Sequence, residues 1–137
     1  GVDEVWLGYA DAVAALARSG QVDILAHPDL AKVFGDRPSP AVWAEVVARL
    51  ADAARDGGCC IEISTAGLRK RVGELYPAPD LLRAFRERGV PLTLASDAHV
   101  PENVGRDFDA ALALARSAGY ETVTVFDGRR ARQEPLG

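Results

Sequence analysis

The sequence contains no methionine and only two cysteines, and both scarcities are informative. Because translation starts at methionine, a chain that begins with Gly1 and has none is expected to be processed or to be part of a longer protein. Cys59 and Cys60 are neighbours whose side chains point to opposite faces of a strand, so no disulfide is expected between them. Unpaired cysteines favour a reducing compartment and predict a cytoplasmic location. A redox pair or a metal clip is the alternative for these two thiols.

Long apolar runs and a strong charge of one sign are also missing. No run reaches the roughly 18–20 residues that cross a bilayer, and no signal peptide opens the chain, so no membrane partner is predicted. With 16 basic and 20 acidic residues the net charge is −4, which gives no general attraction to nucleic-acid phosphates. The 48% hydrophobic and 26% charged residues are typical of a globular protein, and 137 residues suffice for one domain with its own core.

Four short apolar runs recur along the chain, starting about 30 to 37 residues apart, which is the spacing of a strand, a crossover helix and two loops. They are Val22–Ala26, Cys59–Ile63, Leu92–Ala95 and Thr122–Val125. Alternation of strands with helices predicts an α/β fold in which a parallel sheet is covered by helices. No linker or second domain is evident, so residues 1–137 are expected to belong to a single domain.

Helical periodicity and end signals predict four helices between these strands. The second has the clearest boundaries, with Ser39-Pro40 at its start and Gly57-Gly58 at its end. The predicted helices are Tyr9 to Arg18, Pro40 to Gly57, Pro79 to Arg88 and Asp107 to Ser117. The 16-residue connection Ser64–Pro79 is the longest, and long ordered loops in α/β proteins often carry function.

The only two histidines of the chain follow predicted strands. His27 follows the first strand, and Asp97 and His99 follow the third. Reactive groups of βα folds lie at the carboxyl ends of the strands, and Asp97 and His99 would face the same way in extended chain. Imidazole and carboxylate together suit zinc, manganese or iron, so we predict that His27, Asp97 and His99 bind divalent metal. The alternative is that Ser96 and Asp97 only cap a turn and that His99 is a surface residue.

Two further carboxylates lie near these ends. Asp29 either hydrogen-bonds a ligating histidine or caps the next turn, and the cap is favoured. Glu62 alternates with Cys60 and Ser64 and so could face the interior, where a carboxylate needs a metal or an ion pair with arginine.

The loop after Ser64 carries Arg69, Lys70 and Arg71. An arginine fork matches phosphate oxygens, so Arg69 could hold a substrate phosphate, whereas a solvated run of charges is the simpler explanation. No glycine-rich phosphate loop and no nucleophile elbow is present.

Three segments resemble motifs of the PHP (polymerase and histidinol phosphatase) superfamily, and most closely its histidinol-phosphatase branch. They are His27-Pro-Asp-Leu, Glu62-Ile-Ser-Thr-Ala-Gly-Leu-Arg-Lys70 and Ser96-Asp-Ala-His99, with Tyr76-Pro-Ala-Pro79 following the second. The resemblance covers about Val22 to Arg129. It implies part of a distorted (β/α)7 TIM-like barrel with up to three divalent metal ions (Zn, Mn or Fe) at the rim.

By that resemblance His27, Asp97 and His99 are metal ligands and Arg69 grips the substrate phosphate, with Asp29, Glu62, Ser64 and Lys70 as candidates for supporting contacts. The implied activity is hydrolysis of L-histidinol phosphate to L-histidinol and phosphate, a phosphomonoesterase step of histidine biosynthesis. Ser64 stands where the family often has asparagine.

The opening H-x-H pair of the family, its further amino-terminal histidines and its bridging glutamate are absent, so residues 1–137 are expected to be the carboxyl-terminal portion of one barrel. Alone, the chain is expected to bind metal weakly and to hydrolyse nothing. Three alternatives remain. They are a PHP-type phosphodiesterase or nuclease, a non-catalytic half-barrel that pairs with a second chain through open sheet edges, and an amidohydrolase-type metal barrel.

Overall fold

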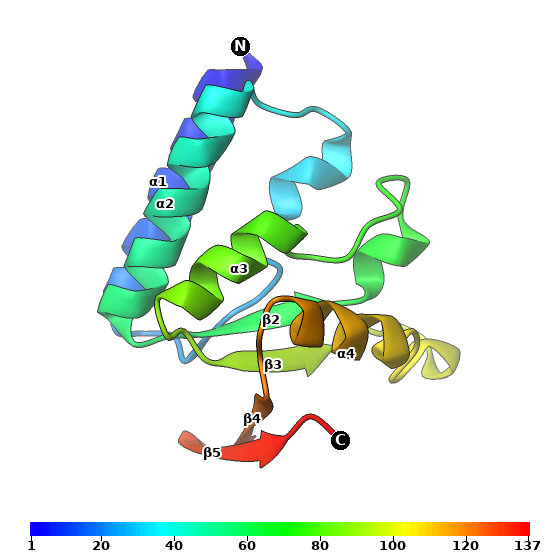
Figure 1. The fold of residues 1–137 in the computed structure, drawn as a ribbon. Coiled ribbons are helices and arrows are strands. Elements are labelled where there is room, and N and C mark those ends of the chain that lie inside the picture. Colours follow the sequence, from blue (N-terminus) through cyan, green and yellow to red (C-terminus); the bar gives the residue numbers. More distant parts are fainter.

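A computed structural model describes all 137 residues and shows a mixed α/β fold (Figure 1). The helices are α1 (Val2–Arg18), α2 (Pro40–Gly57), α3 (Pro79–Glu87) and α4 (Phe108–Ser117). The strands are β1 (Ile24–Leu25), β2 (Cys60–Ser64), β3 (Leu92–Ala95), β4 (Thr122–Asp127) and β5 (Arg130–Pro135). Three short 3₁₀ helices lie in the connections: η1 (Leu30–Phe34), η2 (Ala66–Arg69) and η3 (Pro101–Asn103). The predicted α/β class is confirmed.

The main sheet is parallel, with the strand order β1-β2-β3. Helices α1 and α2 lie side by side along most of their lengths, and α3 packs against α2 above the sheet (Figure 1). Between these helices and the sheet lies one apolar core. Its largest members include Trp6, Leu50, Ile61, Phe85 and Leu92. The crossover helices therefore cover the sheet as the alternation of elements predicts.

Most predicted boundaries agree with the structure. The helix α2 begins after Ser39, whose hydroxyl accepts a hydrogen bond from the Val42 amide, and it ends before Gly58, which is left-handed. These are the cap and stop signals that predict its ends. The helix α1 begins at Val2 rather than at Tyr9, because a first turn containing acidic residues extends it toward Gly1.

The prediction of a fourth parallel strand over Thr122–Val125 is wrong. The strand β4 instead pairs antiparallel with β5 through the two-residue loop Gly128–Arg129. It lies next to β3 without joining its ladder. The Asp127-Gly128 dipeptide is a hairpin signal, but the polar composition of β5 hides the partner strand.

Both cysteines are buried and unpaired, as the sequence predicts. Burial raises the pKa of both thiols, that of Cys60 to about 12. Low thiolate content makes these cysteines poor nucleophiles and poor metal ligands. None of the helices combines the length and the apolar character that a membrane span requires.

Candidate active site

The predicted site residues gather at the carboxyl ends of the three parallel strands. His27 lies two residues beyond β1, Ser64 ends β2, and Ser96 and Asp97 directly follow β3. The register aligns Ser64 with Ala95, so β2 and β3 end side by side. This edge of the sheet, with the segments that follow the three strands, is called the rim below.

His27 and Asp97 share a backbone feature that the sequence does not predict. Both have positive φ, 30° at His27 and 50° at Asp97, and only one other non-glycine residue of the chain, Asp107, shares this feature. Left-handed backbone is costly for residues with a β-carbon and occurs preferentially at functional sites. The two turns at the ends of β1 and β3 are therefore held in place by their surroundings.

The imidazole of His27 is half-buried and lies edge-on to the ring of Tyr76, with 6.1 Å between the ring centroids and an angle of 67° between the planes. Tyr76 itself is buried and reaches the rim because its backbone forms an antiparallel bridge with Ser64. The Ser64 amide donates to the Tyr76 carbonyl (2.8 Å), and the Tyr76 amide donates to the Ser64 carbonyl (3.1 Å). The long loop after β2 thus folds back onto the end of its own strand.

Glu62 is half-buried in β2, and its pKa responds to both His27 and Asp97. Burial raises the pKa of Glu62, the proximity of His27 lowers it, and the negative charge of Asp97 raises it. None of the ion pairs of the structure involves Glu62, so the alternative of an arginine partner does not hold. Glu62 therefore links the ends of β1 and β3 electrostatically.

Asp97 and His99 line one hollow of about 330 Å³ together with Arg69 and Lys70. Both are exposed, and Nδ1 of His99 lies 3.0 Å from the carbonyl oxygen of Asp97. The expectation that they align as alternate residues of an extended strand is wrong, because β3 ends at Ala95 and Asp97 is left-handed. A turn brings them together instead.

Arg69 is fixed in this hollow by the end of β3. Its Nη2 donates to the Ser96 carbonyl at 2.7 Å, while its buried Nη1 has no hydrogen-bond partner. Gly67 makes this placement possible, because a β-carbon at that position would lie 1.9 Å from the Glu74 carbonyl oxygen. A guanidinium with one anchored and one unused nitrogen can donate a hydrogen bond to an anionic oxygen.

Asp29 does not have the capping role that the sequence favours. It occupies the N-cap position of η1, but its side chain makes no capping hydrogen bond. Its buried carboxylate accepts instead from the Ala78 amide (2.9 Å) and forms an ion pair with Lys32 (3.0 Å). The Lys32 ammonium also donates to the Leu75 carbonyl (2.6 Å), so this pair joins η1 to the loop after β2.

Unpartnered polar atoms are concentrated in the rim. Four buried side-chain nitrogen or oxygen atoms lack a hydrogen-bond partner, and all follow β1 or β2. They belong to Asp29, Thr65, Arg69 and Tyr76. Buried polar atoms are nearly always satisfied, so a cluster of exceptions indicates contacts beyond those that the chain itself supplies.

The donor groups at the rim suit a divalent metal ion in kind, because they are imidazole and carboxylate. Glu62 is influenced by both His27 and Asp97, and Asp97 shares a hollow with His99. No three histidine, cysteine, aspartate or glutamate side chains lie close enough together to hold an ion. Metal binding by His27, Asp97 and His99 therefore stays a prediction.

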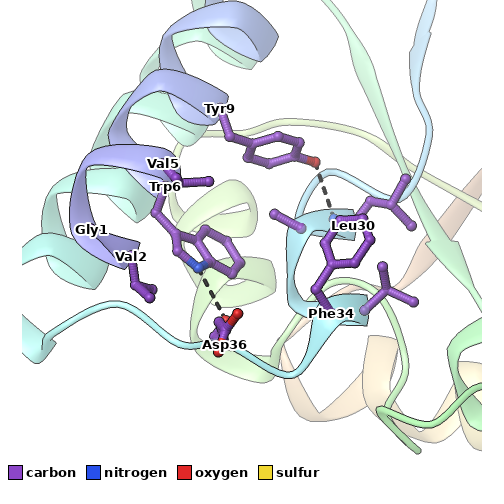
Figure 2. A pocket seen from close by; sticks show the side chains of 10 residues that line it. Gly1, Val2, Val5, Trp6, Tyr9, Leu30, Phe34 and Asp36 are labelled. Carbon is purple, nitrogen blue, oxygen red and sulfur yellow. Dashed lines mark hydrogen bonds between the residues drawn. The ribbon is translucent and has the colours of Figure 1, made fainter.

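A larger hollow than the one at the rim lies elsewhere. It is apolar, has a volume of about 550 Å³ and is formed between α1 and η1 by residues that include Val5, Trp6 and Phe34 (Figure 2). None of the predicted ligands lines it.

Sequence reasoning missed Tyr9, Lys32 and Tyr76, which shape the rim through contacts with Pro28, Leu75 and His27, respectively, 19 to 49 residues away in sequence. The only local signal is the spacing of Asp29 and Lys32, which matches one helical turn.

Curated proteins with similar sequences are named as phosphatases. The chain is 44% identical over 116 residues to "Probable histidinol-phosphatase" of Deinococcus radiodurans, a match that covers 85% of this chain and 44% of that protein. It is 31% identical over 104 residues to "Probable histidinol-phosphatase" of Schizosaccharomyces pombe, covering 76% of this chain and 33% of that protein. A "Probable phosphatase" of Shewanella loihica is 30% identical over 113 residues. The chain thus spans less than half the length of these relatives.

A crystal structure from Listeria monocytogenes, described as a "putative histidinol phosphatase hisK", has a similar fold. The TM-score is 0.72 at 21% sequence identity, and the similarity covers 80% of this chain and 44% of that one. No family model matches the sequence. The chain is therefore an α/β polypeptide related in sequence to proteins named as histidinol-phosphatases, and its fold corresponds to part of a structure described in the same way.

Proposed function

We propose that the protein to which these residues belong is a metal-dependent phosphomonoesterase that hydrolyses L-histidinol phosphate to L-histidinol and phosphate in histidine biosynthesis. The observation that carries the proposal is the hollow at the rim that Arg69, Asp97 and His99 share. It combines an arginine, a side chain suited to phosphate, with an aspartate and a histidine, side chains suited to divalent metal. The names of the relatives with 44% and 31% identity support the choice of substrate.

In this proposal Arg69 binds a phosphate oxygen through Nη1, because Nη2 is already bonded to the Ser96 carbonyl. Lys70 is exposed beside it and attracts the dianionic substrate. The anchored arginine fixes the orientation of the phosphate, which lowers the entropic cost of reaching the reactive geometry.

His27, Asp97 and His99 would hold divalent ions of zinc, manganese or iron. Glu62 and Asp29 would make supporting contacts around His27. Bound ions would supply Lewis-acid activation of the attacking water and neutralise charge on the phosphoryl group. The left-handed backbone at His27 and Asp97 places both side chains where the strands end. Ser64 keeps the loop in place, because its hydroxyl accepts from the Ala66 amide (3.3 Å).

We further propose that residues 1–137 form the carboxyl-terminal portion of one barrel domain and that further ligands come from outside this stretch. The proposal is supported by the span of the match, 44% of the Deinococcus protein, and by the absence of a three-ligand group within the chain. It follows that this chain alone binds divalent ions weakly and does not turn over substrate.

The test measures phosphate release from L-histidinol phosphate and from a dinucleotide by the full-length protein after loading with Mn²⁺ or Zn²⁺. We expect turnover of L-histidinol phosphate only, with a loss of at least about 100-fold in kcat/KM for Asp97→Asn and for His99→Ala. Asp109→Asn, on the exposed face of α4, is the matched control and should keep wild-type activity. Preference for the dinucleotide, or full activity after exhaustive chelation, would contradict the proposal. Turnover by residues 1–137 alone would contradict the proposal that some of the metal ligands lie outside this stretch.

A further inference from the structure

The hydroxyl of Tyr9 joins helix α1 to the turn that follows β1. It donates a hydrogen bond to the Pro28 carbonyl (2.8 Å) and accepts one from the Leu30 amide (3.1 Å), the second of which is drawn in Figure 2. Both bonds go to the backbone of the segment that begins with His27. One side chain from a distant helix thus contacts this turn on both sides of Asp29.

The same Leu30 amide also closes the turn itself. It donates to the His27 carbonyl at 3.0 Å, so the Tyr9 hydroxyl and the His27 carbonyl share one N–H group. The Tyr9 hydroxyl is therefore bonded directly to the peptide group that defines the turn at His27.

This turn needs support because the conformation of His27 is unfavourable. Its φ is +30°, outside the common left-handed well, and it precedes a proline, which biases the preceding residue toward extended backbone. Such a conformation is energetically unfavourable and persists only where the surroundings impose it. Local sequence therefore disfavours the observed orientation of the imidazole.

The ring of Tyr9 is itself held firmly. It packs edge-on against Trp6 with 5.9 Å between the ring centroids, and Trp6 is part of the core. Burial raises the pKa of Tyr9 to about 12, so the hydroxyl keeps its proton at neutral pH and can both donate and accept. A rigid, neutral phenol suits a bridge that needs one donor and one acceptor.

We propose that Tyr9 is a positioning residue for His27: its hydroxyl bridge fixes the left-handed turn and so directs the imidazole toward Tyr76 at the rim. The proposed orientation of the His27 imidazole is inferred only from the contacts of Tyr9 described above. The consequence for metal affinity rests on the proposed function, in which His27 is a ligand.

The matched control is Tyr120. It is a buried tyrosine, and its hydroxyl, like that of the half-buried Tyr9, donates to a backbone carbonyl, that of Val90, at the same distance of 2.8 Å. Val90 lies just before β3, at the amino end of the sheet, far from the rim. Tyr9→Phe and Tyr120→Phe therefore each remove one hydroxyl that is hydrogen-bonded to the backbone, and only the first touches the turn at His27.

The experiment compares the wild type, Tyr9→Phe and Tyr120→Phe by NMR of the labelled protein. The readouts are the ¹³Cα and ¹³Cβ shifts of His27 and the nuclear Overhauser effect between the rings of His27 and Tyr76. For Tyr9→Phe we expect the carbon shifts to move toward extended values and the Overhauser effect to fall by at least about half. For Tyr120→Phe we expect both to stay as in the wild type, although thermal stability falls in both variants. Unchanged His27 signals in Tyr9→Phe, together with lower stability, would overturn the inference.

A second measurement separates this inference from the proposed function. Titration of the wild type with Zn²⁺ should shift the ring nitrogens of His27, and Tyr9→Phe should weaken that binding by at least about tenfold, the lower end of the effect of supporting groups on metal affinity. A His27 ring that does not respond to Zn²⁺ in the wild type would contradict the metal role of His27 and leave the positioning inference to the carbon shifts. A responsive ring with equal affinity in the Tyr9→Phe variant would overturn the positioning inference alone.

Discussion

The ammonium group of Lys32 lies 3.0 Å from the carboxylate of Asp29, and neither side chain is exposed to solvent at all. Lys32 also donates to the Leu75 carbonyl and lies 5.0 Å from the ring centroid of Tyr76. A buried charge is tolerated when its partners compensate for lost hydration, and removal of one partner leaves the other uncompensated. The two loops that carry His27 and Tyr76 are thus joined by an interaction that does not tolerate the loss of either member.

The first prediction concerns this pair. Lys32→Met should lower the free energy of unfolding by about 3–5 kcal/mol, since it leaves the Asp29 carboxylate buried without its counter-charge. Urea denaturation measures the change. The double variant Asp29→Asn/Lys32→Met should recover a large part of the loss. Lys70→Met, at the only other lysine of the chain, is the exposed control and should stay within about 0.5 kcal/mol of the wild type. Equal losses in the two lysine variants would refute the buried pair.

The second prediction separates the two neighbouring arginines of the loop after β2. Arg69→Gln should weaken binding of inorganic phosphate by at least about tenfold, because Arg69 lines the hollow and its Nη1 has no hydrogen-bond partner within the chain. Arg71→Gln should change it by less than about twofold, since Arg71 is exposed and makes no ion pair. Isothermal titration calorimetry of the metal-loaded full-length protein gives both values. Similar effects of the two substitutions would mean that the loop acts only through its total charge.

The third prediction concerns the close approach at Gly67. A β-carbon there would lie 1.9 Å from the Glu74 carbonyl oxygen and 3.0 Å from Tyr76, so Gly67→Ala must displace the loop. We expect a loss of at least about 2 kcal/mol in stability, together with weaker phosphate binding. Gly8→Ala is the control, because Gly8 lies within α1 and nothing is within 4 Å of a β-carbon there. That variant should be stabilised by about 0.5–1 kcal/mol. Wild-type stability of Gly67→Ala in thermal unfolding would show that the loop is not packed this closely.

The fourth prediction concerns pH. Arg129 forms two hydrogen bonds with the Asp23 carboxylate, 2.8 and 2.9 Å long, and thereby ties the loop of the β4–β5 hairpin to the segment before β1. Hydrogen bonds from Arg129 lower the pKa of Asp23 in the folded state. A carboxyl group with a lowered folded pKa stabilises the fold above its unfolded pKa of about 3.9, and that contribution disappears as the pH falls through the folded value.

Arg129→Gln should therefore reduce stability at pH 7, and its unfolding curve should converge with that of the wild type at low pH. Because both side chains are partly exposed, added salt should reduce the difference. Urea unfolding between pH 2 and 7 tests both points. Arg130→Gln, next in sequence and without an ion pair, is the control. A difference that persists at pH 2 would rule out this electrostatic origin.

The fold was predictable wherever local signals agreed with tertiary packing. The strand β3 occupies the predicted residues Leu92–Ala95, and α2 begins and ends at its predicted cap and stop. The fourth strand shows the limit of this reasoning. An apolar run at Thr122 indicates a strand, but it does not tell whether the partner lies parallel or antiparallel.

The location of the candidate residues in the fold was predictable from the sequence, but the arrangement of their side chains was not. Polar residues after buried strands locate the rim, and the structure puts His27, Asp97 and Arg69 there. The left-handed backbone at His27 and Asp97 has no signal in the sequence, because it depends on distant partners such as Tyr9. Asp29 shows the same limit, since its partner Ala78 is far along the chain.

The hairpin of β4 and β5 also affects how molecules of this protein meet one another. Residues Arg130 to Gln133 of β5 are all exposed, and two of the four are arginines. A strand that paired with this edge would have to desolvate their charged guanidinium groups. Charged side chains and short edge strands commonly protect a sheet against pairing with the sheet of another molecule. The main sheet has its own outer edge at β1, which consists of Ile24 and Leu25 only. A strand of another molecule that approached this edge could therefore pair with a backbone stretch of only two residues.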